Sequence, residues 1–159
     1  MIIVPYEPIY KDQVASLITG IQQGEFNVPI TLQDQPDLMN IDTFYQIKNG
    51  NFWCAMVGDE LVGTIALIDM GAGEACIRKM FVRADYRGQE HGTAHQLHDT
   101  MLAWCSQKSI EQVYLGTLNY LDAAIRFYSK KGYEAIDPAD LPASFPRMPV
   151  DNRFYTKRL

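Results

Sequence analysis

Residues Ile77–Leu97, IRKMFVRADYRGQEHGTAHQL, combine a strand, a glycine-bearing loop and the start of a helix. The β-prone run KMFV leads into a loop with Gly88 and Gly92, and helical spacing begins after it. The first N–H groups of a helix lack partners and carry partial positive charge, so this corner can hold a pyrophosphate. Arg87 adds a fixed charge and Thr93 a hydroxyl. An ordinary strand–turn–helix corner has the same pattern, so the glycines alone leave both interpretations open.

A metal site is the rival interpretation, because His91, His95 and His98 are all the histidines of the chain and lie in this region. Their i, i+4, i+7 spacing projects along one helix face, and imidazoles at that spacing can share a zinc ion. However, His91 precedes Gly92, and no carboxylate or cysteine is obviously placed to complete the site. We therefore expect no metal, and histidines that flank the apolar face or meet solvent.

The flanking sequence predicts a mixed sheet. Upstream, NFWCAMV and ELVGTIALIDM flank the turn Gly58-Asp59, and a GAG turn at 71–73 leads into EACIRKMFV, which predicts three antiparallel strands in a row. Elsewhere the patterns predict strands at 2–7, 110–118, from Tyr133 and near Arg153–Lys157, helices at Lys11–Gln23, Gly92–Gln107 and Asp122–Lys131, and one or two short helices within 24–51.

This order of elements predicts one domain over residues 1–159, with a mixed, mostly antiparallel α/β sheet of about seven strands. Helices are expected on both faces. The strand ending at Val82 and the strand starting at Ile110 are joined through a helix, so they should run parallel. A crevice can open where these fourth and fifth strands separate.

Composition narrows the function. The chain has 14 basic and 19 acidic residues, a net charge of −5 and no long run of either sign, which disfavours nucleic acid and anionic membrane as partners. No apolar stretch approaches the ~20 residues that span a bilayer, and the N-terminus lacks signal-peptide features, so we expect a cytoplasmic protein. The three cysteines are widely spaced in apolar sequence, which favours reduced core residues.

Three stretches in order, IRKMFVRADYRGQEHGTAHQL, VYLGTL and AAIRFYSKKGYEAI, resemble the GNAT superfamily of acyl-CoA-dependent N-acyltransferases. The resemblance covers about Gly63 to Ile136, and the earlier hairpin agrees with it in order. It implies a pyrophosphate-binding loop of the form Arg/Gln-x-x-Gly-x-Gly/Ala and a helix that ends in Tyr-x-x-x-Gly-Phe or Tyr. It also implies the GNAT fold, with its sheet splayed at the cofactor site.

The resemblance assigns roles to particular residues. The backbone of Phe81 and Val82 is expected to face the pantetheine arm of acetyl-CoA. Tyr128 matches a tyrosine that can protonate the leaving thiolate, which is chemistry that a phenol can perform. The residues expected to hold the pyrophosphate are Arg87, Gly88, Gly92, Thr93 and Ala94.

The sequence departs from the family pattern in three places. Glu90 replaces the second loop glycine, and its carboxylate would repel a pyrophosphate unless it points to solvent. Leu121 stands where an asparagine is common. Cys76 replaces the strand glutamate that some members use as a base. Glu74, two residues away on the same strand face, is a candidate base, and a water chain is the alternative route for the proton.

Taken together, the sequence predicts an N-acetyltransferase that moves an acetyl group from acetyl-CoA to a primary amine by direct attack in a ternary complex. The acceptor, a small molecule or a protein, is expected near the segment Phe26–Tyr45 and near DLPASFPRM at 140–148. The candidate lining residues are Phe26, Tyr45, Phe145 and Arg147, each of which could equally be a packing or surface residue. A homodimer is a further expectation from the family. The alternatives are a non-catalytic acyl-CoA-binding or regulatory module of the same fold, and the zinc protein.

Overall fold

A computed structural model describes residues 1–159. Its seven-stranded sheet has the order β1-β2-β3-β4-β5-β7-β6, and β4 and β5 are its one parallel pair of neighbours. The strands are β1 (Ile2–Pro5), β2 (Asn51–Val57), β3 (Glu60–Gly71), β4 (Glu74–Val82), β5 (Gln112–Thr117), β6 (Glu134–Ala135) and β7 (Arg153–Arg158). The prediction of a mixed, mostly antiparallel sheet is confirmed.

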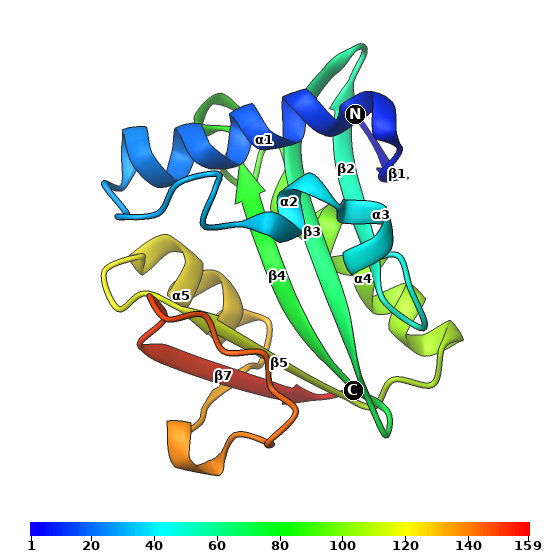
Figure 1. Cartoon of the computed structure of the whole chain (residues 1–159), viewed down its shortest axis with the longest axis vertical. Coiled ribbons are helices and arrows are strands. Elements are labelled where there is room, and N and C mark those ends of the chain that lie inside the picture. The colour runs from blue at the N-terminus through cyan, green and yellow to red at the C-terminus, as the bar shows by residue number, and fades with distance from the viewer.

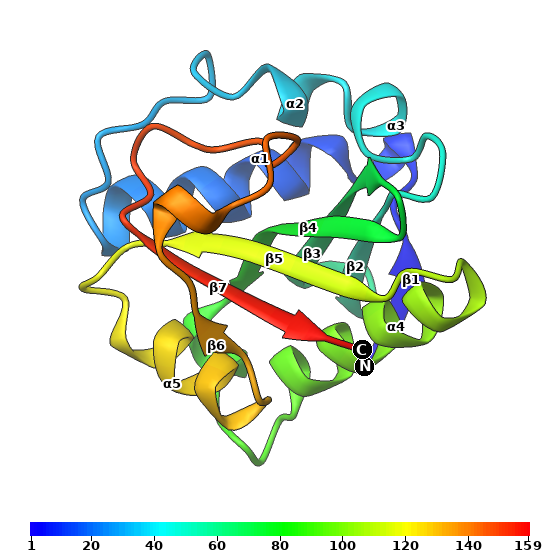
Figure 2. The same cartoon turned by 90° about the horizontal axis from the view of Figure 1, so that it is seen from below.

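Helices cover both faces of the sheet (Figures 1 and 2). Figure 2 shows α1, α2 and α3 on one side and α4 and α5 on the other. The helices are α1 (Lys11–Thr19), which continues as the π-helical turn η2 (Gly20–Glu25), α2 (Pro36–Met39), α3 (Ile41–Phe44), α4 (Thr93–Gln107) and α5 (Asp122–Lys130). Short 3₁₀ turns are η1 (Pro8–Tyr10), η3 (Ala84–Tyr86) and η4 (Pro138–Asp140).

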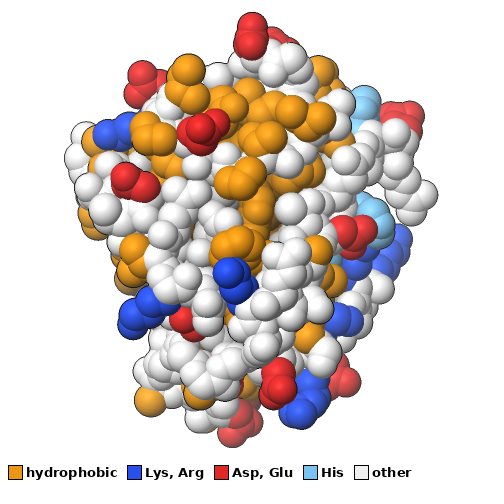
Figure 3. Space-filling view, turned by 90° about the vertical axis from the view of Figure 1, so that its right-hand side faces the viewer, with side chains coloured by type: hydrophobic (Ala, Val, Ile, Leu, Met, Phe, Trp, Pro, Cys, Tyr) orange, Lys and Arg blue, Asp and Glu red, His pale blue; other side chains and the backbone are white.

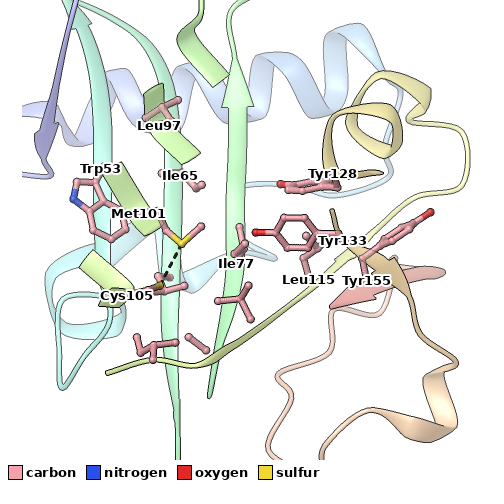
Figure 4. Close-up of a cluster of buried hydrophobic side chains, with 14 of the residues drawn as sticks. Trp53, Ile65, Ile77, Leu97, Met101, Cys105, Leu115, Tyr128, Tyr133 and Tyr155 are labelled. Carbon is pink, nitrogen blue, oxygen red and sulfur yellow. Dashed lines mark hydrogen bonds between the residues drawn. The ribbon is translucent and has the colours of Figure 1, made fainter. Parts of the chain in front are cut away.

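Each face of the sheet has its own hydrophobic core. The larger cluster packs α4 and α5 against the sheet and includes Trp53, Leu97, Met101 and Tyr128 (Figure 4). The second cluster lies between the sheet and α1 to α3. The strands β2 and β3 are buried over most of their length because both of their faces are covered, which explains their nearly continuous apolar sequence.

The parallel pair β4 and β5 separates partway along its length. The two strands pair from Glu74 with Gln112 to Ile77 with Leu115, and the rest of β4 pairs only with β3 (Figure 1). Just beyond Ile77, between Arg78 and Phe81, the register between β3 and β4 shifts, and Lys79 adopts φ 52°. Such a bulge bends a strand. The predicted splay between the fourth and fifth strands is therefore confirmed, and its local cause is the bulge at Lys79.

The β1 edge of the sheet is a candidate surface for association. Hydrophobic side chains gather on the face shown in Figure 3, on the side where β1 lies in Figure 1. The strand pairs with β2 alone, and Ile2 and Ile9 are among the exposed large hydrophobic residues. An unpaired strand edge with apolar surroundings can pair with a strand of another chain. This edge is a place where the predicted homodimer could form, and the homodimer stays a prediction. No helix combines the length and apolar composition needed to cross a membrane.

Candidate active site

A cavity of about 860 Å³ opens where β4 and β5 separate. Its walls come from both strands, the loop before α4 and the first turn of α4, the length of α5, the first half of η2 with residues 26–30, and residues 148–151. Of the sequence-predicted site residues, the cavity wall contains Phe81, Val82, Arg87, Gly88, Gly92, Ala94 and Tyr128. It contains neither Thr93 nor Glu74. Seven of the nine predicted residues therefore converge on one cavity.

The loop before α4 presents free backbone donors to this cavity. Gly88 has φ 101° and Gly92, the N-cap of α4, has φ 64°, conformations that suit glycine. Because Thr93, Ala94 and His95 form the first turn of α4, their N–H groups have no preceding turn to bond, and no other backbone acceptor pairs with them. The result is a cluster of N–H groups at the positive end of a helix.

Arg87 is held at the rim of the cavity by three contacts. Its Nε donates to the carbonyl oxygen of Val82 at 2.8 Å, and its Nη1 and Nη2 form a bidentate pair with Glu25 at the end of η2. Its guanidinium also lies over the ring of Phe26, 5.9 Å from the centroid. The pair with Arg87 lowers the pKa of the Glu25 carboxyl. Arg87 thus links the loop to the N-terminal segment across the cavity.

Removing the Glu25 carboxylate should tighten acetyl-CoA binding. Glu25→Gln frees the Arg87 guanidinium and removes a negative charge beside the loop donors. Since exposed ion pairs are worth about 0.2–1 kcal/mol, we expect Kd to fall by up to about fivefold. Calorimetric titration with acetyl-CoA measures this change. The matched control is Glu60→Gln, which removes the 3.7 Å partner of Arg83 outside this cavity; weaker binding in Glu25→Gln would contradict the idea that Glu25 competes for Arg87.

The carboxylate of Glu90 points away from the loop donors. Its side chain is 84% exposed and lies 3.7 Å from His91 Nε2. Glu90 is also absent from the cavity wall. The sequence raised the condition that this carboxylate must face solvent for the loop to accept a pyrophosphate, and the arrangement meets that condition.

The three histidines contact three different neighbours. The ring of His91 packs on Tyr86, His95 lies beside Asp99 and Lys131, and the buried His98 Nε2 shares a 2.7 Å hydrogen bond with Tyr133 Oη. Burial lowers the pKa of His98 to about 4. The i, i+4, i+7 spacing therefore does not gather the three imidazoles around one point. Of the three, His95 alone lines the cavity.

Thr93 was expected to offer its hydroxyl to the pyrophosphate, and the structure corrects this expectation. The side chain is buried, and Oγ1 donates to Met1 Sδ at 3.3 Å. The cause is helical geometry: Thr93 starts the face of α4 that packs on β3, where its methyl group lies close to Gly63. Thr93 can therefore contribute only its backbone N–H group to the donors of the loop before α4.

Tyr128 reaches from α5 toward β4 and lines the cavity (Figure 4). It packs edge-on against Phe127 and Tyr133, and its hydroxyl forms no hydrogen bond within the protein. Burial raises the pKa of the phenol above its ordinary value, so the group stays protonated at neutral pH. Tyr128 is therefore a fixed and unengaged hydrogen-bond donor at the cavity wall.

Glu74, the candidate base, lies away from the cavity. It is the first residue of β4, at the end where β4 and β5 still pair, and it accepts a 2.9 Å hydrogen bond from Tyr114 Oη. The cavity lies at the other end of β4, so Glu74 does not face the same space as Tyr128. Cys76 is completely buried, and burial raises the pKa of its thiol to about 12. Neither residue is placed to take a proton from a group in the cavity.

Several residues at the cavity were not predicted from the sequence. Arg126 and Lys130 on α5, and Lys131 directly after it, add positive charge to the cavity wall. The signal was present in IRFYSKKGY, where Arg126 and Lys130 stand i, i+4 on one helix face. Asp151 also lines the cavity from the segment before β7. No local pattern marks this aspartate, because its position depends on how β7 pairs with β5.

Of the residues that the sequence predicts to face the acceptor, one lines the cavity and the others do not. Phe26 lines the cavity, whereas Tyr45 is fully buried and donates to Asp37 at 2.5 Å. Phe145 and Arg147 instead pack on Phe154 in β7. Each predicted segment contributes other apolar residues to the cavity wall, Val28 and Ile30 from the first and Met148 from the second, and Val150 lies just beyond the second segment. That these segments face the acceptor stays a prediction.

The splayed sheet, the free N–H groups at a helix start and the basic rim define a class of proteins that binds a phosphate-bearing cofactor between two strands. Comparison with known proteins places the chain in one such family. Residues 18–133 match the Acetyltransferase (GNAT) family. This chain belongs to that family, which confirms the resemblance found in the sequence.

Individual relatives support the assignment. An acetyltransferase of the GNAT family from Staphylococcus aureus Mu50 superposes with a TM-score of 0.95 at 39% identity, over 99% of this chain and 98% of that one. An acetyltransferase from Streptococcus agalactiae 2603 gives a TM-score of 0.95 at 27% identity, over 99% and 98% of the two chains. "Probable N-acetyltransferase camello" of Xenopus tropicalis is 27% identical over 67% of this chain and 49% of its own length, so this chain spans about half of that relative.

Proposed function

We propose that this protein is an N-acetyltransferase that moves an acetyl group from acetyl-CoA to a primary amine. The observation that carries the proposal is the placement of the free N–H groups before α4 and the unengaged phenol of Tyr128 on one cavity between β4 and β5. The first suits a pyrophosphate and the second a leaving thiolate. Membership in the GNAT family supports the same reaction class.

The residues divide the work along the cavity. Gly88, Gly92 and the first turn of α4 bind the pyrophosphate, with Arg87 at the rim. The backbone of Phe81 and Val82, on the part of β4 that lacks a β5 partner, faces the pantetheine arm. Because β5 does not pair with this part of β4, the pantetheine arm can lie alongside β4 in the position that a paired strand would occupy.

Acetyl-CoA supplies the acetyl group as a thioester, already activated for attack. The protein therefore needs to orient the acceptor and to stabilise charge, and orientation alone can contribute up to ~7–11 kcal/mol in favourable cases. An N–H group of the splayed strand, proposed to be that of Val82, polarises the thioester carbonyl. Tyr128 donates a hydrogen bond to the sulfur as the thiolate leaves, and no covalent intermediate with the protein is required.

Amine-dependent release of free CoA tests the function. Purified protein and acetyl-CoA are mixed with 2-phenylethylamine, spermidine, an amino acid amide or a lysine peptide, and the free thiol is followed with a thiol reagent. We expect at least one amine to raise the rate well above the rate of acetyl-CoA hydrolysis. Binding of acetyl-CoA without amine-dependent release for any acceptor would instead favour the non-catalytic binding module.

A further inference from the structure

Asp151 is one of two acidic residues in the cavity wall, and the other is Asp122, the first residue of α5. Asp151 lies in the segment that leads into β7, and its carboxylate folds back over β5 at Gly116. A Cβ atom at Gly116 would lie only 2.6 Å from Asp151 Oδ2, so the absence of a side chain at 116 makes room for this carboxylate. Gly116, Asp151 and Tyr128 all line the same cavity.

The Asp151 carboxylate has no partner within the protein. It accepts no hydrogen bond and forms no ion pair, although it is only partly exposed. The charged groups that act on it are Arg78 and Lys79 on β4 and Arg147 in its own segment. Burial nevertheless raises its pKa to about 6, because none of these cations contacts it directly.

Both β4 cations are held by other groups. Lys79 Nζ donates to Gln35 Oε1 at 2.5 Å and lies 3.5 Å from Asp37, within a buried polar cluster on the α2 side of the sheet. Arg78 Nη2 contacts Met148 Sδ at 2.7 Å. These contacts keep the cations near Asp151 without closing an ion pair, so the carboxylate stays open to the cavity. An unpaired, half-buried carboxylate costs stability, and such a cost is typical of a functional group.

We propose that Asp151 binds the ammonium group of the acceptor and takes its proton. This inference rests on the proposed acetyl transfer and adds the base that neither Glu74 nor Cys76 supplies. A primary amine is mostly protonated at neutral pH, with a pKa near ~10 for a lysine-like amine, so it must lose a proton before it attacks. The carboxylate of Asp151 is the acceptor for that proton.

The step balances as follows. Asp151 removes one proton from the ammonium group, and the neutral nitrogen forms a bond to the thioester carbonyl carbon. The carbon–sulfur bond then breaks, the sulfur takes the proton of the Tyr128 hydroxyl, which solvent replaces, and the nitrogen loses its second proton to solvent. Asp151 then releases its proton to solvent. The products are the N-acetyl amine, free CoA and one proton, with no change of oxidation state.

The surroundings of Asp151 also define the acceptor. The cavity wall near this carboxylate is apolar and includes Val28, Ile30, Leu118, Met148 and Val150. A single ammonium on an apolar body matches one open carboxylate in such a wall, whereas additional positive charges meet the nearby cations on β4. We therefore infer that 2-phenylethylamine is a better acceptor than spermidine.

The test compares Asp151→Asn with Asp140→Asn, an exposed aspartate in the same segment that lies outside the cavity. We expect Asp151→Asn to lower kcat/KM for 2-phenylethylamine by about tenfold to a hundredfold at pH 7, because water replaces the carboxylate poorly as a base. For the parent protein, kcat/KM should rise with pH with an apparent pKa near 6. This rise should be absent from the pH profile of Asp151→Asn. The Kd for acetyl-CoA should be unchanged in both variants.

Thermal unfolding gives a second readout that does not depend on turnover. The folded pKa of Asp151, about 6, lies above its ordinary value of 3.8, so ionisation opposes folding between these pH values and the full cost persists above them. Asp151→Asn should therefore raise Tm at pH 8 and have no such effect at pH 4. Gly116→Ala, which crowds the carboxylate, should lower kcat/KM without abolishing acetyl-CoA binding.

The outcomes separate the two proposals. Equal kcat/KM for the parent and Asp151→Asn would overturn the role of Asp151 and leave acetyl transfer intact. Loss of activity in Glu74→Gln with full activity in Asp151→Asn would move the base to β4. If no amine stimulates CoA release by the parent, the proposed function fails and the role of Asp151 falls with it.

Discussion

Replacing Tyr128 by Phe is expected to lower kcat for amine acetylation by about a hundredfold to a thousandfold, the range typical of a lost acid or base group. The change removes one oxygen atom and keeps the ring that packs between Phe127 and Tyr133. In the low-polarity surroundings of the cavity wall, a departing thiolate without a hydrogen-bond donor is strongly disfavoured. The loss should therefore appear in kcat and leave the KM for the amine little changed.

Stability and cofactor binding serve as the controls for this variant. Because the Tyr128 hydroxyl forms no hydrogen bond within the protein, Tyr128→Phe should keep the Tm and the acetyl-CoA Kd of the parent. Tyr120→Phe makes the same change at a residue that is 49% exposed and outside the cavity, and it should keep full activity. A Tyr128→Phe protein with the kcat of the parent would remove the phenol from the mechanism.

Gly88→Glu should weaken acetyl-CoA binding by at least about a hundredfold, because opposed like charges at close range cost several kcal/mol. Gly88 lines the cavity, and a Cβ added there meets no atom within 4 Å, so the new side chain would occupy the space beside the loop donors. The φ of 101° also strains any residue with a side chain. Calorimetric titration with acetyl-CoA measures the loss.

A matched glycine separates charge in the site from backbone strain. Gly71 has φ 82°, has no atom within 4 Å of an added Cβ and is the exposed last residue of β3, next to the turn that leads into β4. Gly71→Glu should therefore lower Tm by a similar amount and leave acetyl-CoA binding intact. Equal binding by Gly88→Glu and the parent would show that the loop before α4 does not hold the pyrophosphate.

Local sequence patterns were sufficient for much of this protein. Alternating and continuous apolar runs, the Gly58-Asp59 turn and the helical spacing after Gly92 predicted the order of strands and helices. These patterns are readable because side-chain direction repeats every two residues in a strand and about every 3.6 in a helix. The loop glycines and the tyrosine of α5 also belong to short motifs, so Gly88, Gly92 and Tyr128 were placed at the cavity before any contact was known.

Other features depended on contacts between distant segments. Thr93 and Glu74 have the chemistry expected of site residues, but both are engaged elsewhere. The Thr93 hydroxyl donates to Met1 Sδ, and the Glu74 carboxylate accepts a hydrogen bond from Tyr114. The bulge at Lys79 sets where β4 leaves β5, and the pairing of β7 with β5 brings Asp151 over Gly116. No periodicity records such contacts, because they join residues that are far apart in the chain. The sequence alone therefore determines the family and identifies the loop glycines that line the cavity, whereas tertiary packing decides which carboxylate faces that cavity.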